Sequence, residues 1–221
     1  HPVIFQLIDE IIFPEPSLAE EDGLLAIGGD LSQERLLLAY SLGIFPWYSA
    51  NEPILWFSPH ERFVLYPDNV VVSHSMKQLI KSGKYEIRWN TTFKEVMLAC
   101  AQLPRRGQDG TWINDDMVKA YCALNQKGIA QSVEIWMGEE LVGGLYGVVS
   151  GSVFCGESMF SKESNTSKLA LIALCISGKY ELIDCQVHTP HLESMGGIFI
   201  SRKEFEEVLK RKTPRISTER I

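Results

Sequence analysis

The chain has 221 residues, of which 45% are hydrophobic and 22% are charged, and its formal net charge is −7 at pH 7. This length and composition are typical of a globular protein with a sizeable core, in one large or two small domains. The acidic balance argues against a general nucleic-acid binder. The apolar runs are too short to span a bilayer and no signal-peptide pattern is present, so we expect no membrane association.

The distribution of charge and the spacing of the cysteines indicate where RNA could bind and in which compartment the protein works. Residues 1–60 contain a single basic residue, Arg35, whereas residues 61–106 are rich in lysine and arginine. Any contact with RNA is therefore expected to be local, in this middle segment or in the basic tail from Lys210. The five cysteines include no Cys-x-x-Cys pair, which favours free thiols and a cytoplasmic location over disulfides or a zinc site.

The first part of the chain shows little periodicity. Ser32 is positioned to cap a helix that runs to about Leu42. Aromatic residues then crowd a proline-punctuated loop over residues 45–57, either to pack a small domain or to form a stacking surface for a base. The composition changes after Arg62, so we predict a small N-terminal domain over 1–62 and a second domain over 63–221.

The segment after residue 62 begins with two short predicted strands, FVLY and VVV. A helix capped by Ser73 or Ser75 follows. Its His74, Lys77 and Lys81 share one face and Lys84 lies just beyond, which fits either a solvated face or a phosphate-contacting face. A capping box at Thr92–Glu95 predicts a further helix to about Ala101, and Asn114 or Asp115 caps another that ends near Gly128.

Residues 133–160 are predicted to form three strands joined by two tight turns. Strict alternation in the last strand places Glu157 on one face with Val153, Cys155 and Met159, in a setting where a carboxylate needs a partner. The middle strand contains three glycines, which weaken a strand unless something approaches its backbone closely. We interpret this pair of strands as the floor of a binding site. The glycines are Gly143, Gly144 and Gly147.

A largely apolar helix from Thr166 to about Ser177 is expected to be buried against this sheet. The strand over 182–187 places Asp184 and Gln186 on one face and Cys185 on the other. An antiparallel meander followed by a buried helix and a strand predicts an α+β fold. The predicted architecture is a small N-terminal domain plus an N-acetyltransferase-like (GNAT-like) C-terminal domain.

Asp184, Gln186 and Glu157 are the strongest catalytic candidates, because two acids and an amide on adjacent strands can face one cleft. Cys185 is disfavoured as a nucleophile because it points among apolar neighbours, and His188-x-x-His191 lacks further metal ligands. The pyrophosphate-binding signature of acetyl-coenzyme A enzymes is absent before Thr166. We therefore expect no metal and no cofactor.

Long ordered blocks of the chain resemble the bacterial leucyl/phenylalanyl-tRNA–protein transferases. These blocks are FPEPSLAEEDGLLAIGGDLSQERLLLAYSLGIFPWY, PILWFSP, GTWI, ELVGGLYG, FCGESMFS and LIDCQV, and together they extend over nearly the whole chain. The resemblance implies transfer of Leu, Phe or Met from aminoacyl-tRNA to proteins that begin with Arg or Lys, marking them for degradation.

The resemblance also implies roles for individual residues. Asp184 and Gln186 correspond to the family's catalytic pair, with Asp184 expected to draw a proton from the acceptor amine, and Glu157 corresponds to its third polar site residue. Other residues are expected to contact the adenosine and the aminoacyl group: Trp47, Trp112, Phe154, Gly144, Leu145, Met159 and Ile183. Lys77, Lys81 and Lys84 are expected to contact the tRNA backbone.

The departures from the family pattern are mild. Phe57 stands where a second Trp is usual, His60-Glu61 replace an acid–proline pair, and Thr166 stands for Ala. Met195 and Gly197 also differ, so the expected differences concern pocket shape. Two other functions remain open on the residues alone: an acetyl-coenzyme A N-acyltransferase, and a non-enzymatic RNA-binding or adaptor protein in which the site polars only satisfy the strands.

Overall fold

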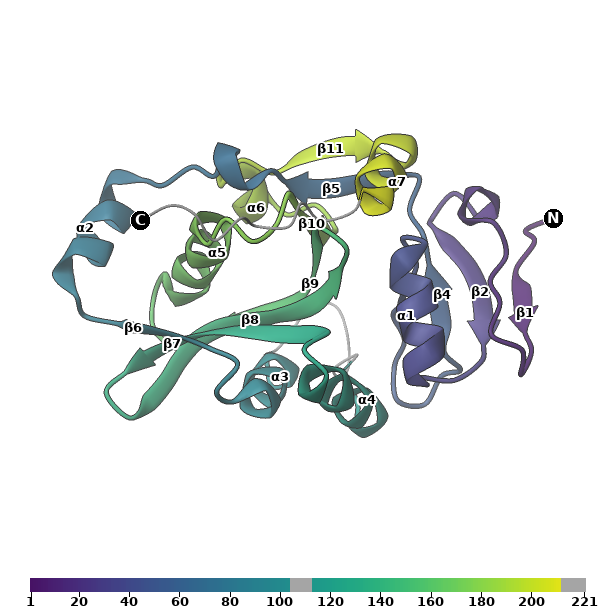
Figure 1. The fold of residues 1–221 in the computed structure, drawn as a ribbon, viewed down its shortest axis with the longest axis horizontal. Helices are drawn as coiled ribbons and strands as arrows, with labels where there is room; N and C mark the ends of the chain where they lie inside the picture. Colours follow the sequence, from purple (N-terminus) through teal and green to yellow (C-terminus); the bar gives the residue numbers. More distant parts are fainter. Residues whose placement is uncertain (104–112, 212–221) are drawn as a thin grey trace.

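The structure is a computed structural model that describes residues 1–103 and 113–211. Its N-terminal part is a small sheet with strand order β1-β2-β4-β3, packed beside one helix (Figure 1). The elements of this part are β1 Phe5–Leu7, η1 Pro16–Leu18, β2 Leu24–Gly28, α1 Gln33–Ser41, β3 Phe45–Pro46 and β4 Leu55–Phe57.

The rest of the described chain is built on a seven-stranded sheet with strand order β11-β5-β10-β9-β8-β7-β6. Every neighbouring pair in this sheet is antiparallel except β9 and β10, which are parallel. The first half comprises β5 Glu61–Leu65, η2 Pro67–Asn69, α2 His74–Ser82, β6 Glu86–Trp89, α3 Phe93–Ala101 and α4 Asp115–Gln126. The second half comprises β7 Ala130–Met137, β8 Glu140–Ser150, β9 Val153–Ser161, α5 Thr166–Ile176, β10 Leu182–Gln186, α6 Pro190–Ser194, β11 Ile198–Ser201 and α7 Arg202–Lys210.

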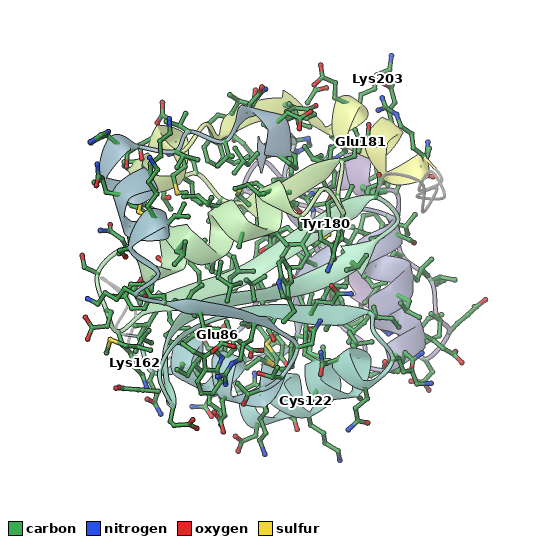
Figure 2. All side chains as sticks on the ribbon, turned by 60° about the vertical axis from the view of Figure 1, so that its left-hand side comes forward. Glu86, Cys122, Lys162, Tyr180, Glu181 and Lys203 are labelled. Atoms are coloured by element: carbon green, nitrogen blue, oxygen red, sulfur yellow. The ribbon has the colours of Figure 1, made fainter. Side chains whose placement is uncertain are left out.

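Helices cover both faces of the large sheet. Helix α5 lies across β7, β8 and β9 on one face, and α3 and α4 lie on the other (Figure 1). Figure 2 shows the same layers with side chains between them, with Tyr180 close to the α5 side and Cys122 on α4 at the opposite edge. One apolar cluster joins α3, α4 and the N-terminal sheet, and a second lies under α2, α5 and α6. The sheet is therefore buried on both faces.

The predicted α+β architecture is confirmed. The meander β7-β8-β9, the buried helix α5 and the parallel strand β10 follow in the order expected for an acetyltransferase-like domain. Helix α5 is apolar nearly all round, and most of its residues are buried. Strand β5 begins at Glu61 and pairs within the large sheet, and the boundary proposed after Arg62 stays a prediction.

Two local expectations about strands need correction. Residues 70–72 form no strand, although the Val71 N–H bonds the carbonyl oxygen of Met195 at 2.9 Å. Strands β1, β2 and β4 were not predicted. They are three to five residues long and one pairing contains a register shift, so they leave no clear alternating pattern.

The predicted capping box at the start of α3 is wrong. Thr92 is the N-cap residue, but its side chain makes no capping bond. The buried carboxylate of Glu134 on β7 accepts the Thr92 N–H at 3.2 Å and the Thr91 N–H at 3.0 Å instead. A residue more than forty positions away therefore satisfies the helix terminus, which no local pattern reveals. Other caps agree with expectation, since Ser32, Ser73 and Asn114 each accept a bond from the first turn of their helix.

The glycines of β8 are explained by contacts within the chain. A Cβ on Gly143 would lie 2.2 Å from Oγ1 of Thr166, where α5 begins, and one on Gly144 would lie 2.6 Å from the Val133 carbonyl oxygen. A Cβ on Gly147 would meet the Cys155 carbonyl oxygen at 2.4 Å. These glycines let the helix and the neighbouring strands approach β8 closely.

The described helices include none that is both long and apolar enough to cross a membrane. All five cysteines lie within the described residues, and none of them forms a disulfide with another.

Candidate active site

The site lies where the parallel pairing of β9 with β10 ends. The last paired residues are Cys155 and Asp184. Two residues later β9 has a bulge, because Tyr146 and Gly147 on β8 pair with Ser158 and Gly156, which leaves Glu157 as the extra residue. The bulge aims the Glu157 side chain at the junction between the two strands.

This bulge also corrects the alternation predicted for β9. Val153 and Cys155 pack in the cluster with α3 and α4, as expected of residues that share a face. Beyond Glu157 the phase is inverted, so Met159 packs under α5 and Phe160 returns to the α3 and α4 side. One extra residue in a strand exchanges its two faces from that point on.

Strand β10 is irregular at the matching position. Its register against β5 shifts between Asp184 and Gln186, and Gln186 has a left-handed backbone with φ of 61°. The Gln186 N–H donates to Oδ1 of Asp184 at 2.8 Å. This bond holds the backbone in a conformation that costs free energy for a residue other than glycine.

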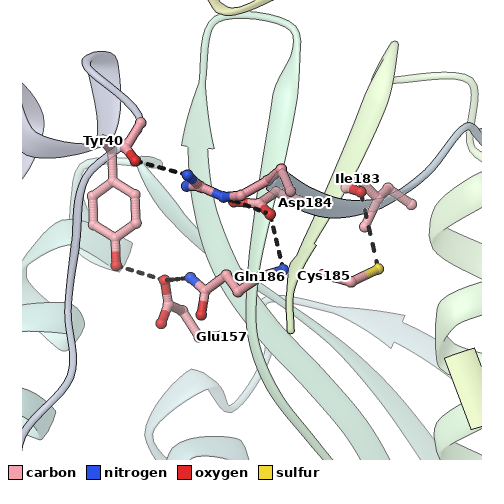
Figure 3. Close-up of polar contacts among 8 residues, drawn as sticks. Tyr40, Glu157, Ile183, Asp184, Cys185 and Gln186 are labelled. Carbon is pink, nitrogen blue, oxygen red and sulfur yellow. Dashed lines mark hydrogen bonds and ion pairs between the residues drawn. The ribbon is translucent and has the colours of Figure 1, made fainter. Parts of the chain in front are cut away.

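The structure brings the three predicted catalytic residues together. Gln186 Nε2 donates to Glu157 Oε1 at 3.1 Å, and Asp184 accepts the backbone bond of the same glutamine (Figure 3). All three side chains lie on the side of β9 and β10 that faces helix α1. Asp184 is fully buried and Glu157 is 8% exposed.

Arg62 was not predicted as a site residue. Its Nε lies 3.2 Å from each carboxylate oxygen of Asp184, and its Nη2 lies 3.2 Å from Oδ2. Its Nη1 donates to the Gly43 carbonyl oxygen at 2.9 Å, and the guanidinium lies over the rings of Phe45 and Phe205. An arginine directly before the apolar run Phe63–Leu65 was a usable signal, because a buried cation requires an acidic partner.

Two tyrosines also reach the site without having been predicted. The Tyr40 hydroxyl, on α1, donates to Glu157 Oε1 at 2.5 Å and lies 2.6 Å from the Tyr121 hydroxyl on α4. Burial, first of all, raises the pKa of both phenols well above the usual value, and the nearby Glu157 charge adds to this. Both hydroxyls therefore act as neutral hydrogen-bonding groups.

An apolar cavity of about 340 Å³ lies under α5 and opens at these residues. Four predicted substrate contacts, Leu145, Phe154, Met159 and Ile183, all line it. The lining is completed by Tyr146, Gly156, Glu157, Ser158, Leu171, Leu174, Asp184, Cys185, Val187, Thr189, His191 and Leu192. Its interior is dominated by aliphatic and aromatic side chains, so it suits an apolar group of side-chain size.

A second, smaller cavity of about 70 Å³ lies on the other side of the same point. It is lined by Phe45 and Pro46 from β3, by Trp47 directly after that strand, and by Gln186 from β10. Glu157, Cys185 and Val187 line both cavities. The indole of Trp47 and the carboxylate of Glu157 therefore border one opening.

The remaining predicted contacts lie elsewhere. Gly144 lines neither cavity and stays a prediction as a substrate contact. Trp112 lies outside the described residues. Lys77, Lys81 and Lys84 are exposed on and just after α2, away from both cavities.

Two disfavoured chemistries have no support from the geometry. Burial raises the pKa of the Cys185 thiol far above its usual value, so it is a poor nucleophile. The His188 ring packs against Phe63 and Phe199, and its Nε2 bonds Glu193 at 2.6 Å. In the parts of the chain that the structure describes, no cluster of three or more His, Cys, Asp or Glu residues is arranged to hold a metal.

The chain is similar to known proteins over almost its full length. Residues 64–210 match the family model described as leucyl/phenylalanyl-tRNA protein transferase, and residues 29–60 match the model of that family's N-terminal domain. A leucyl/phenylalanyl-tRNA–protein transferase of Flavobacterium johnsoniae is 52% identical over 212 residues, which are 95% of this chain and 100% of the relative. One from Psychromonas ingrahamii is 53% identical over 203 residues, covering 90% of this chain and 85% of the relative.

Proposed function

Because the chain belongs to the leucyl/phenylalanyl-tRNA–protein transferase family, we propose that it transfers Leu, Phe or Met from aminoacyl-tRNA to a protein. The acceptor is the α-amine of an N-terminal Arg or Lys, the product is a new peptide bond, and the longer N-terminus marks the protein for degradation. Aminoacyl-tRNA is a cytoplasmic substrate, so we place the enzyme in the cytoplasm.

The observation that carries this proposal is the junction of two unlike cavities at Glu157. The apolar cavity fits the side chain of the transferred residue. At the smaller cavity beside it, Glu157 and Gln186 supply polar groups for the ester and the incoming amine. An aliphatic and aromatic lining favours Leu, Phe and Met over polar residues. Exclusion of β-branched residues rests on shape, which is worth about 1–3 kcal/mol for each methylene-sized difference.

The rest of the donor has matching surfaces. Trp47 borders the smaller cavity, where its indole can stack on the terminal adenine of the donor. Trp112 lies outside the described residues, and its contact with the donor stays a prediction. Lys77, Lys81 and Lys84 supply exposed cations for the phosphates of the acceptor arm. An enzyme that accepts tRNAs for several amino acids gains nothing from reading one anticodon.

The reaction itself needs little activation. The aminoacyl ester is already a reactive acyl donor, so the step needs no nucleotide. The acceptor α-amine has an ordinary pKa of about 7.7–8.0, so at neutral pH most of it must lose a proton before it attacks. Glu157, Asp184 and Gln186 are the polar groups at the junction, and the acidic pair also favours a cationic Arg or Lys side chain.

The test is transfer of labelled Leu from leucyl-tRNA to a peptide that begins with Arg. A peptide of the same sequence that begins with Asp is the matched acceptor control, and acetyl-coenzyme A is the control donor. We expect label only in the Arg peptide and only from the tRNA donor. Acetylation of the peptide would favour an acetyltransferase, and tRNA binding without transfer would favour a non-enzymatic RNA-binding protein.

A further inference from the structure

The two carboxylates of the site have different surroundings. Both oxygens of Asp184 are occupied, because Arg62 Nε reaches each of them at 3.2 Å and the Gln186 N–H donates to Oδ1 at 2.8 Å. Arg62 is itself fixed by the Gly43 carbonyl oxygen and by two aromatic rings. An ammonium group that approached Asp184 would have to displace a buried guanidinium. Asp184 is therefore placed to hold Gln186, and poorly placed to meet a substrate.

Glu157 has the opposite arrangement. Its Oε1 accepts bonds from Tyr40 and Gln186, but no donor within residues 1–103 and 113–211 reaches its Oε2. Its carboxylate lines both cavities and has no salt-bridge partner among the described residues. Figure 3 shows Oε1 directed at Tyr40 and Gln186. Among the residues that the structure describes, the second oxygen is thus an acceptor of the site to which no donor is bound.

The hydroxyls behind Glu157 form an ordered chain. Tyr40 has one proton and donates it to Glu157, so the proton in the bond between the two hydroxyls belongs to Tyr121. The direction is thus Tyr121 to Tyr40 to Glu157. These hydrogen bonds connect helix α4, which packs on the large sheet, and helix α1 of the N-terminal part to the carboxylate. They fix Oε1 without covering Oε2.

Burial raises the pKa of Glu157 to about 7, and the Asp184 charge acts in the same direction. Bonds from Tyr40 and Gln186 and the charge of Arg62 act against it. The other titratable groups facing Glu157 are Tyr121 and Cys155, which stay neutral because burial raises the pKa of each. A base whose pKa lies close to that of an α-amine exchanges a proton with it at little cost.

We propose that Glu157 takes the proton from the acceptor α-ammonium, and that Asp184 and Arg62 are positioning residues that set the Gln186 backbone. This assignment rests on the proposed transferase function and changes the role expected of Asp184. It is carried by Oε2 of Glu157, which lies at the junction of the cavities and accepts no bond from the described part of the chain, and by the occupied oxygens of Asp184.

The proton balance of the step is complete without a further reactant. The α-ammonium gives one proton to the Glu157 carboxylate, and the amine nitrogen then forms a bond to the ester carbonyl carbon. The bond between this carbon and the ribose oxygen breaks, and the oxygen takes a proton back from the Glu157 carboxylic acid. The second proton that leaves the nitrogen passes to solvent, and the products are the peptide bond and a free ribose hydroxyl.

The test is the pH dependence of kcat/KM for the Arg peptide in the wild type and in point variants. In the wild type we expect kcat/KM to rise with pH through a limb of the profile centred near pH 7, where Glu157 loses its proton. Glu157→Gln should lose this limb and about 10²–10⁴-fold in rate. Tyr40→Phe removes a bond that lowers the pKa, so the limb should move to higher pH. Tyr121→Phe, which touches Glu157 only through Tyr40, is the matched control and should move it less.

The limb set by the peptide's own amine is the same in every variant, so any limb that moves belongs to the enzyme. Asp184→Asn should lower turnover, and because it removes a charge that raises the pKa of Glu157, it should move the limb to lower pH without abolishing it. If Asp184→Asn does not fold, the comparison of Tyr40→Phe with Tyr121→Phe decides alone.

An unmoved limb in Tyr40→Phe together with a retained limb in Glu157→Gln would overturn the assignment, as would loss of the limb in a folded Asp184→Asn. Absence of transfer by the wild type at every pH would overturn the proposed function itself, and the assignment with it.

Discussion

The two faces of strands β9 and β10 differ in how they are built. On the face towards α1, α3 and α4, Asp184 and Glu157 are buried with Arg62, Tyr40 and Tyr121 as partners. On the face towards α5, the same strands contribute apolar side chains to a cavity of about 340 Å³. Buried polar groups require fixed partners, whereas an apolar wall needs only the right shape. The polar face therefore fixes the chemistry, and the apolar face sets the choice of side chain.

The largest effect is expected from breaking the ion pair on the polar face. Arg62→Met should destabilise the protein by about 3–5 kcal/mol, because it leaves the fully buried Asp184 charge without its partner. The double variant Arg62→Met with Asp184→Leu should recover much of this loss. Urea denaturation measures both. A single variant as stable as the wild type would show that the pair contributes little to the polar face.

The polar face should also make stability depend on pH. Glu157 has a raised pKa in the folded state, from 4.5 to about 7, so the folded state binds its proton more tightly than the unfolded chain. The resulting stabilisation is fully present below about pH 4.5 and is lost as the pH rises through 7. The difference corresponds to roughly 3 kcal/mol. Urea unfolding of wild type and Glu157→Gln between pH 5 and 8 checks this, and parallel curves would contradict it.

A substitution on the apolar face should change which amino acid is transferred. Leu174→Trp narrows the cavity under α5, so transfer of Phe should fall about 10–200-fold relative to the wild type, with Leu less affected. The apparent affinity for the Arg peptide should not change. Ile176→Trp on the same helix is the matched control, since Ile176 is 70% exposed. Equal losses for Phe, Leu and the peptide would mean that the change disturbs the fold.

The smallest effect is expected far from both faces. Lys77→Ala with Lys81→Ala should weaken aminoacyl-tRNA binding and flatten its log K against log salt slope by about one to two units. A minimal aminoacyl-adenosine donor should be unaffected. Lys94→Ala with Lys127→Ala removes two exposed lysines from α3 and the end of α4 and is the matched control. Equal salt slopes for both double variants would mean that the α2 lysines are ordinary solvated residues and do not contact the tRNA backbone.

The sequence predicts the meander, the buried helix and the grouping of Glu157, Asp184 and Gln186, because strand alternation and helix periodicity are local signals. It does not predict the bulge at Glu157, which depends on how β9 pairs with β8. The residues Arg62, Tyr40 and Tyr121 are also missed, since each lies 81 to 122 residues along the chain from the group that it bonds. The contacts of the two tyrosines arise from packing and leave no local pattern, whereas Arg62 left one signal, a basic residue next to a run of apolar residues.

The role of the β8 glycines also depends on contacts that the sequence does not show. In the sequence they predict space for a substrate, yet Gly143 and Gly144 accommodate Thr166 and the Val133 carbonyl oxygen. A glycine indicates that something approaches closely, but its sequence does not say whether the neighbour is a ligand or the protein itself.

The most direct test of the central claim is the protonation of Glu157 itself. Carboxyl ¹³C NMR of the labelled protein, with Glu157→Gln to assign the resonance, gives the titration midpoint without any turnover. We expect a midpoint near 7, and a higher one in Tyr40→Phe. A midpoint near the ordinary value of 4.5 that does not respond to Tyr40→Phe would contradict the role of Glu157 as the proton acceptor.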